Sequence, residues 1–181
     1  HVAMAMTTAD LLRHMLMYLV VPLWFAVGLA DYVCHRAALI ERTSGPKESV
    51  LHLVQFGQAG AGLLVALFLV TNAAVLVLLV VCFLSHQATS IWDVGYANAT
   101  RRVGPTEQHV HTVLEAALPV TIGIAAVMDW PAARSGFAIE LRQPALPAWF
   151  LAALTAGAIL VAAAYGEELL RTLRWRHASK S

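Results

Sequence analysis

The sequence predicts an all-α fold, an integral membrane bundle of about five transmembrane helices that occupies residues 1–181 as a single domain. Of its 181 residues, 59% are hydrophobic and only 13% are charged, and the mean hydropathy is +0.68. Soluble domains carry about 25% charged residues, so this composition falls outside the usual soluble range. The net charge of +1 gives no support to nucleic-acid binding. The lipid bilayer is therefore the expected surroundings of the chain.

Five apolar runs mark the expected helices, at residues 15–30, 53–70, 73–84, 116–128 and 149–165. The uncharged stretch 53–85 would reach about 50 Å as one helix, whereas the hydrocarbon core of a bilayer is about 30 Å thick. We therefore place a break at Thr71-Asn72, because asparagine is a good turn and N-cap residue. Pro46 and Pro105 each follow a glycine and suit the first turn of a helix.

Basic residues are distributed unevenly between the two sides of such a bundle. With five alternating spans, nine of the twelve Lys and Arg residues fall on one side, namely Arg36, Arg42, Lys47, Arg101, Arg102, Arg171, Arg174, Arg176 and Lys180. The other side carries Arg13, Arg134 and Arg142. The positive-inside rule makes the arginine-rich side cytoplasmic. We therefore expect an integral protein of a bacterial inner membrane, with its N-terminus outside and its C-terminus in the cytoplasm.

Polar residues at the expected cytoplasmic helix ends repeat one pattern, a histidine and a carboxylate on the same helical face. Residues four or seven positions apart share a face of a helix. The first four helices carry such sets, which are Asp31 with His35, Glu48 with His52, His86 with Asp93, and Glu107 with His111 and Glu115. The topology inferred from charge and hydropathy brings all four sets to one end of the bundle. His109 points away from the Glu107 face, and for it ligation and a role in the loop are equally open.

These ten residues predict a metal site. Charged groups at the edge of the hydrocarbon core are costly unless they are compensated, and metal ions supply the compensating charge. Mixed imidazole and carboxylate ligation suits iron, zinc or manganese. The candidates outnumber the roughly four to six positions of one ion, so we expect two metal ions, with iron as the first choice and zinc as the alternative. The competing interpretation is a set of helix-end ion pairs with Arg36, Arg42, Arg101 and Arg102.

Three further carboxylates lie near the same side of the expected bundle. Glu41 lies off the Asp31 face and is expected to be a helix-end charge partner. Glu167 and Glu168 end the fifth helix, where one of them could join the cluster. Pairing with Arg171 or Arg174, three to seven residues further along, is the favoured expectation for both.

In architecture the chain resembles the membrane-integral di-iron hydroxylases and desaturases, which also hold a metal pair at the cytosolic end of a helical bundle. The resemblance covers the helix ends from Asp31 to Glu115. Those families have several His-x-x-x-His and His-x-x-His-His boxes, whereas this sequence has a single Glu107-Gln108-His109-Val110-His111 box and many carboxylates. The resemblance therefore implies the placement of a metal pair, and the ligand assignments and substrates of those families are not carried over.

The function expected from these patterns is a dinuclear, di-iron oxidoreductase that acts on an apolar substrate such as a lipid or a quinol, with an electron donor as a further partner. One alternative is a zinc-dependent membrane hydrolase in which Glu115 or Glu48 acts as general base. Another is a metal-binding membrane protein without catalysis. A b-type haem between two of the histidines is a fourth option, against which the many carboxylates argue.

The expected orientation can be tested at the C-terminus. Because nine of twelve basic residues lie on one side, a reporter fused after Ser181 should be active in the cytoplasm and silent outside it. A cysteine placed there should be labelled by a membrane-impermeant reagent only after the cells are opened. Labelling of intact cells would reverse the assigned orientation.

Overall fold

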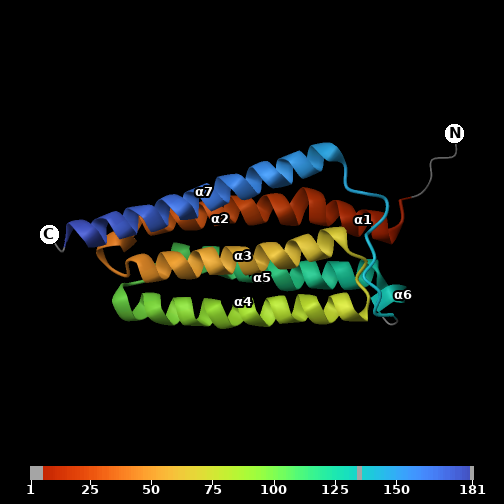
Figure 1. The fold of residues 1–181 in the computed structure, drawn as a ribbon, viewed down its shortest axis with the longest axis horizontal. Coiled ribbons are helices and arrows are strands. Elements are labelled where there is room, and N and C mark those ends of the chain that lie inside the picture. The colour runs from red at the N-terminus through yellow and green to blue at the C-terminus, as the bar shows by residue number, and fades with distance from the viewer. Residues whose placement is uncertain (1–5, 134–135, 180–181) are drawn as a thin grey trace.

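A computed structural model describes residues 6–133 and 136–179 as a bundle of long helices (Figure 1). The elements are α1 (Thr8–Met15), a π-helical segment (Leu16–Val20), α2 (Val21–Ala37), a 3-10 turn (Ile40–Arg42), α3 (Pro46–Phe68), α4 (Ala73–Thr100), α5 (Pro105–Met128), the short α6 (Trp130–Ala133) and α7 (Ala148–Ala178). Two residues of the charge comparison, Arg134 and Lys180, lie outside the described residues.

The expected number of membrane-spanning helices is confirmed. Within the described ranges, five helices are long and apolar enough to cross a membrane, and α1, the π-helical segment and α2 together form the first of them, Thr8–Ala37. The helices continue well beyond the apolar runs of the sequence, because their polar ends remain helical and are buried against one another. The architecture is all-α, as expected. Among the residues described, the one β-type pairing is an isolated bridge between Leu69 and Leu141.

The helix boundaries inferred from single residues are also confirmed. Asn72 is the N-cap of α4, and its side-chain oxygen accepts a hydrogen bond from the Val75 amide at 3.0 Å. This cap separates α3 from α4 at the position where length alone required a break. Pro46 and Pro105 occupy the first turns of α3 and α5, after Gly45 and Gly104. Gly45 adopts a φ of 69°, which favours glycine there.

Helices α2 and α3 are linked through two neighbours that each pack against both of them. Helix α3 packs against α4, α5 and α7, and α2 packs against α5 and α7. The interior between α2 and α3 is therefore lined by α5 and α7. The connections 38–45 and 101–104 and the last turns of α7 lie together at the end of the bundle that carries the C-terminus, hereafter the basic end. Residues 129–133 and 136–147 lie at the opposite end.

A single arginine organises the opposite end. Arg142 donates hydrogen bonds to Asp129 at 2.7 and 2.8 Å and to the backbone carbonyls of Ala66 and Leu69 at 3.1 and 2.8 Å. Those carbonyls belong to the last turn of α3, where helical partners run out. Asp129 in turn accepts from the Thr71 amide at 2.6 Å. The segment after α5 is thus fastened to the end of α3.

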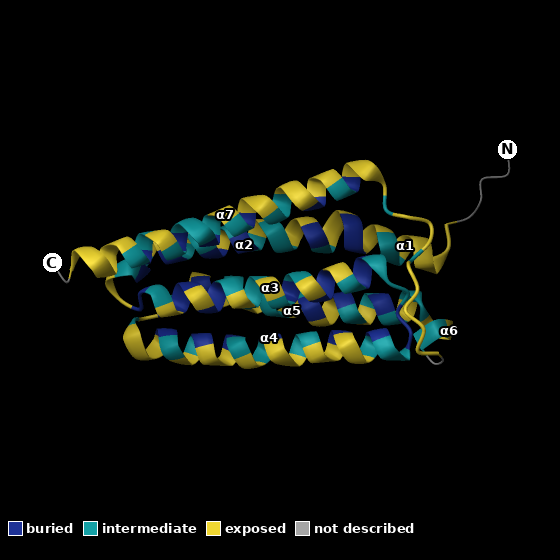
Figure 2. Cartoon of the chain, in the orientation of Figure 1, coloured by how far each residue is buried: buried dark blue, intermediate teal, exposed yellow. Residues whose placement is uncertain are grey.

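Figure 2 shows buried residues along the length of the bundle, and the buried ionisable side chains among them lie toward the basic end. Toward the opposite end, one apolar cluster joins the first span to α3 and α7, with members Leu16, Met17, Val21, Leu63, Leu67, Phe150 and Leu154. A second one joins α3, α4 and α5 through Ala66, Val75, Leu79 and Ala125. Gly62 of α3 lies so close to α5 that a Cβ atom there would be 2.6 Å from Leu118 Cδ1. Small residues allow this close approach of helices.

Candidate metal centre

Seven of the ten predicted ligands come together at the basic end, in the space between α2 and α3. They are Asp31 and His35 of α2, Glu48 and His52 of α3, Asp93 of α4, and Glu107 and His111 of α5. The first six are at most 4% exposed, and His111 is partly buried. The pairing rule of four residues holds within α2, α3 and α5, because each histidine lies one turn after its carboxylate.

The centre of this cluster is a residue that was not among the ten. Glu168 of α7 is fully buried and accepts from Nδ1 of His35 at 2.9 Å and from Nδ1 of His52 at 2.7 Å. The two imidazole rings lie face to face, with centroids 4.1 Å apart and planes 8° from parallel. The expectation that Glu168 pairs with Arg171 or Arg174 is wrong, because its helical face turns inward. Glu167 does pair with Arg171 and also with Arg36, and Glu41 pairs with Arg171 as a helix-end partner.

A sequence signal for Glu168 exists in the spacing of polar residues along α7. Tyr165, Glu168 and Thr172 follow at intervals of three and four residues, which places them on one helical face. All three are buried. The Tyr165 hydroxyl donates to Asp31 at 3.1 Å, and Thr172 lies 3.4 Å from the Ser49 hydroxyl of α3. Helix α7 therefore presents a continuous polar stripe to α2 and α3.

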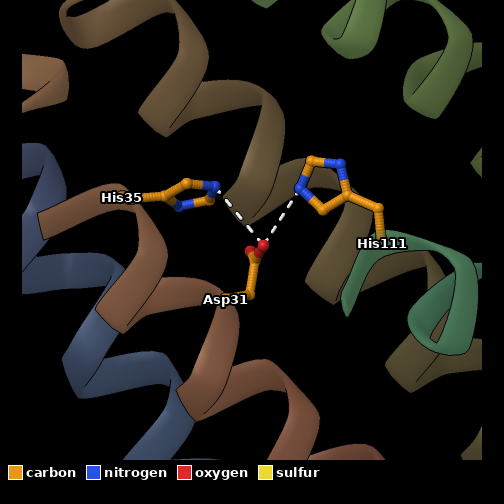
Figure 3. Close-up of side chains that lie close together, drawn as sticks. All are labelled: Asp31, His35 and His111. Atoms are coloured by element: carbon orange, nitrogen blue, oxygen red, sulfur yellow. Dashed lines mark ion pairs between the residues drawn. The ribbon is translucent and has the colours of Figure 1, made fainter. Parts of the chain in front are cut away.

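The other nitrogen of each ring faces carboxylate oxygens. Nε2 of His35 is 3.4 Å from Asp31 Oδ1 and 3.4 Å from Glu107 Oε1. Asp31 Oδ1 is also 3.0 Å from Nε2 of His111, so that this oxygen lies between two imidazoles (Figure 3). On the α3 side, Nε2 of His52 is 3.3 Å from Asp93 Oδ2 and 3.9 Å from Glu48 Oε1.

Several of these atoms lack hydrogen bonds. Among the described residues, Nε2 of His35, Nε2 of His52, Oδ1 of Asp31 and Oδ1 of Asp93 are buried without a hydrogen-bond partner. Because an ionised carboxylate only accepts hydrogen bonds, Glu168 requires the proton of each neutral ring to be on Nδ1. The Nε2 lone pairs then face carboxylate oxygens, which are also acceptors. Such an arrangement becomes favourable when a cation lies between the facing atoms, either a second proton on each ring or a metal ion.

One arginine enters the cluster from the loop between α4 and α5. Arg101 donates to Glu48 at 2.5 Å through Nη2 and at 3.2 Å through Nε, and it also binds Glu107. Burial alone would lower the pKa of the guanidinium, but Glu107 and Glu48 together raise this pKa above its ordinary value. Arg101 therefore stays charged. The ion-pair interpretation of the sequence thus holds for these two carboxylates, whereas the adjacent Arg102 is exposed.

His86, Glu115 and His109 lie outside the cluster. His86 and Glu115 line a cavity of about 50 Å³ that borders it, together with Asp31, His52, Asp93 and His111. Glu115 accepts a hydrogen bond from Ser90 at 2.5 Å. His109 is exposed on the outer side of α5. Helical rotation explains this, because His109 lies two positions from both Glu107 and His111 and therefore on the other side of the helix.

The charges of the cluster do not balance. Five carboxylates, those of Asp31, Glu48, Asp93, Glu107 and Glu168, are buried with the guanidinium of Arg101. Five negative charges and one positive charge leave a sum of −4 when the imidazoles are neutral. In surroundings of low dielectric constant such an excess is unfavourable by several kcal/mol per uncompensated charge. The described residues therefore form a site whose excess negative charge is offset by positive charge, carried either by protons on the imidazoles or by metal ions.

Local geometry within these groups is compatible with metal ligation. Two trios of side chains, Asp31, His35 and His111, and His35, Glu48 and His52, each offer ligand atoms that lie within 4.8 Å of one another. For metal–ligand bonds of about 2.1 Å, neighbouring ligand atoms are about 3.0 Å apart at a right angle and about 3.4 Å apart at a tetrahedral angle. The His–carboxylate separations of 3.0 to 3.4 Å match these spacings.

Comparison of the chain with models of protein families, with curated proteins and with solved structures gave no match.

Arg101 and Arg102 provide a matched test of the ion pairs. Replacing Arg101 by alanine leaves Glu48 and Glu107 buried without a partner, which should lower the free energy of unfolding by about 3–5 kcal/mol. The Arg102→Ala change, at an exposed position, should stay within about 0.5 kcal/mol of the wild type. Thermal unfolding of the purified proteins in detergent measures both. Equal melting temperatures for the two variants would contradict the structural role assigned to Arg101.

Proposed function

We propose that the protein is a membrane-integral dinuclear metal oxidoreductase, with iron as the metal, that acts on an apolar substrate drawn from the bilayer. The proposal depends on one observation: Glu168 binds the Nδ1 atoms of both His35 and His52, so that the Nε2 lone pairs face carboxylate oxygens at ligand spacing. Metal-ligating histidines characteristically donate their other ring N–H to a carboxylate, which fixes tautomer and orientation.

Two metal positions follow from the grouping of the side chains. Asp31, His35 and His111 would hold one ion. Glu48 and Asp93, which both face Nε2 of His52, would hold the other together with that histidine. Glu107, which lies 3.4 Å from His35 Nε2, is available to the first position. Two divalent ions carry a charge of +4, which offsets the excess of −4 described above.

Ligand supply favours iron over zinc. Three imidazoles and four carboxylates surround the two positions, apart from Glu168, and zinc sites usually take about four ligands for each ion, with fewer carboxylates. Bound iron would supply redox chemistry at the polar end of the cavity. Inserting one oxygen atom of dioxygen into a C–H bond consumes two electrons and two protons and releases the second oxygen atom as water. The reductant is therefore an external electron donor.

The residues around the site have roles of their own in this proposal. Glu168 orients the two histidines, and Arg101 holds Glu48 and Glu107 in place. Tyr165 donates to Asp31 and thereby orients its carboxylate. The aromatic wall of the cavity, formed by Trp24, Phe25 and Phe56, would exclude water and accept the apolar part of the substrate.

Metal content is the direct test of this function. Protein purified from iron-57-grown cells should hold two iron ions per chain and give the Mössbauer spectrum of a coupled ferric pair. The His52→Ala and His111→Ala proteins should lose bound iron, because each removes a ligand, and the exposed His109→Ala control should keep it. A single colourless zinc ion, the optical bands of haem, or full occupancy in the His52→Ala protein would refute the proposal.

Glu168 and Glu167 form a matched pair for the orienting role. In Glu168→Gln the amide oxygen still accepts from one histidine, but its NH₂ group cannot accept from the other. Metal affinity, measured by competition with a chelator, should fall about 10–100-fold with the fold retained. Glu167→Gln, which alters a largely exposed ion pair, should change that affinity less than about twofold. Equal metal affinities in the two variants would contradict the role of Glu168 in orienting the histidines.

A further inference from the structure

The cavity beside the cluster has two chemically different walls. One wall is polar and includes Gln55, His86 and Glu115, while the other is formed by the rings of Trp24 and Phe56 and by Val161. Trp24 and Phe56 stack with centroids 5.8 Å apart and planes 14° from parallel. A site with one polar and one aromatic wall fits a ligand that carries a polar group on an apolar body.

Among the described residues, His86 is the cavity-lining side chain outside the metal-ligand cluster whose two ring nitrogens both lack a hydrogen-bond partner. Gln55 donates to Asp93 at 3.0 Å, and Ser90 donates to Glu115, so these side chains are already engaged. Both ring nitrogens of His86 are buried with no hydrogen bond to any described residue, although the Gln55 backbone lies close to the ring. A buried polar group without a partner costs about 1–3 kcal/mol, which an incoming hydroxyl or carbonyl group would recover.

The geometry separates His86 from the proposed metal positions. It belongs to neither trio of ligand atoms, and no carboxylate of the described residues lies within ion-pair distance of its ring. The sequence alone predicts His86 as a metal ligand together with Asp93. In the structure Asp93 faces His52, whereas His86 lies two turns earlier on α4 and borders the cavity.

The volume of the cavity restricts the shape of the ligand. A known cavity that holds a benzene ring measures about 150 Å³, whereas this one measures about 50 Å³. Its size favours a ligand narrower than a quinol ring. The end of an unbranched chain, a hydroxyl or carbonyl group followed by one or two methylenes, is of the right size.

We propose that this cavity binds the hydroxyl or carbonyl end of a linear, single-chain lipid, and that His86 is its hydrogen-bond partner. The aromatic wall contacts the first methylenes of the chain, and the polar end lies beside the cluster. The binding of this ligand is argued from the cavity and from His86. Any reaction that follows binding rests on the proposed function.

Binding can be measured without turnover, because Trp24 lines the cavity. A variant in which Trp92, Trp130, Trp149 and Trp175 are phenylalanine reports on Trp24 alone. In nanodiscs, metal-loaded and metal-free protein are titrated with 1-decanol, with decane and with a benzoquinone that carries a decyl chain. The fluorescence of Trp24 should saturate with 1-decanol at a concentration about tenfold lower than with decane.

Variants of His86 test whether this residue causes the preference for 1-decanol over decane. His86→Leu should bind 1-decanol no better than decane and should keep its bound metal, while His86→Gln, which retains a hydrogen-bonding group, should keep part of the preference. The His109→Leu control should behave as the wild type. Loss of metal in His86→Leu, an unchanged preference for decanol in that variant, or tighter binding of the quinone than of decanol would each overturn the proposal. A wild-type protein that prefers decanol but holds no metal would refute the proposed function and support this site.

Discussion

The carboxylate of Glu168 joins two imidazoles from different helices, and the basic end of the bundle depends on this shared contact. Its two oxygens fix His35 on α2 and His52 on α3, whose rings consequently stack. Helices α2 and α3 are thereby held at a set distance through α7, and the space between them remains open for the other carboxylates. Because the charge of Glu168 is buried, moving any one of the three helices would leave it without its partners, at a cost of several kcal/mol.

The two halves of the molecule have different interiors, one apolar and the other polar. Toward the opposite end the helices are joined by apolar packing around Leu63 and Leu67, by the close approach at Gly62, and by Arg142. At the basic end the interior is polar, with an excess of negative charge. The apolar packing of one half stabilises the fold. The other half can then keep polar groups whose hydrogen-bonding capacity is not filled within the protein, as is common for functional sites.

The sequence predicts the number of spans and several helix ends, because each depends on local properties, whereas the apolar runs underestimate the lengths of the helices. The apolar runs, the cap at Asn72 and the prolines at 46 and 105 are examples. Helical spacing also gathers Asp31, His35, Glu48 and His52 correctly at one end. Helical spacing does not give the rotation of one helix relative to another. For this reason the sequence assigns Glu168 to the wrong partners and does not predict which carboxylates Arg101 binds. The short α6 and the pairing of Leu69 with Leu141 depend on contacts between distant segments, and no local sequence pattern predicts them.

The position of Glu168 in the last helix has a consequence for biogenesis. Ribosomal synthesis delivers α2 to α5 first, and these helices carry Asp31, His35, Glu48, His52, Asp93, Glu107 and His111 into the bilayer before α7 exists. Until α7 arrives, the two histidines lack the acceptor that orients them, and the polar interior faces lipid or solvent on one side. Insertion of α7 thus supplies the missing acceptor, and a chain truncated before residue 148 leaves the charged groups of α2 to α5 without it.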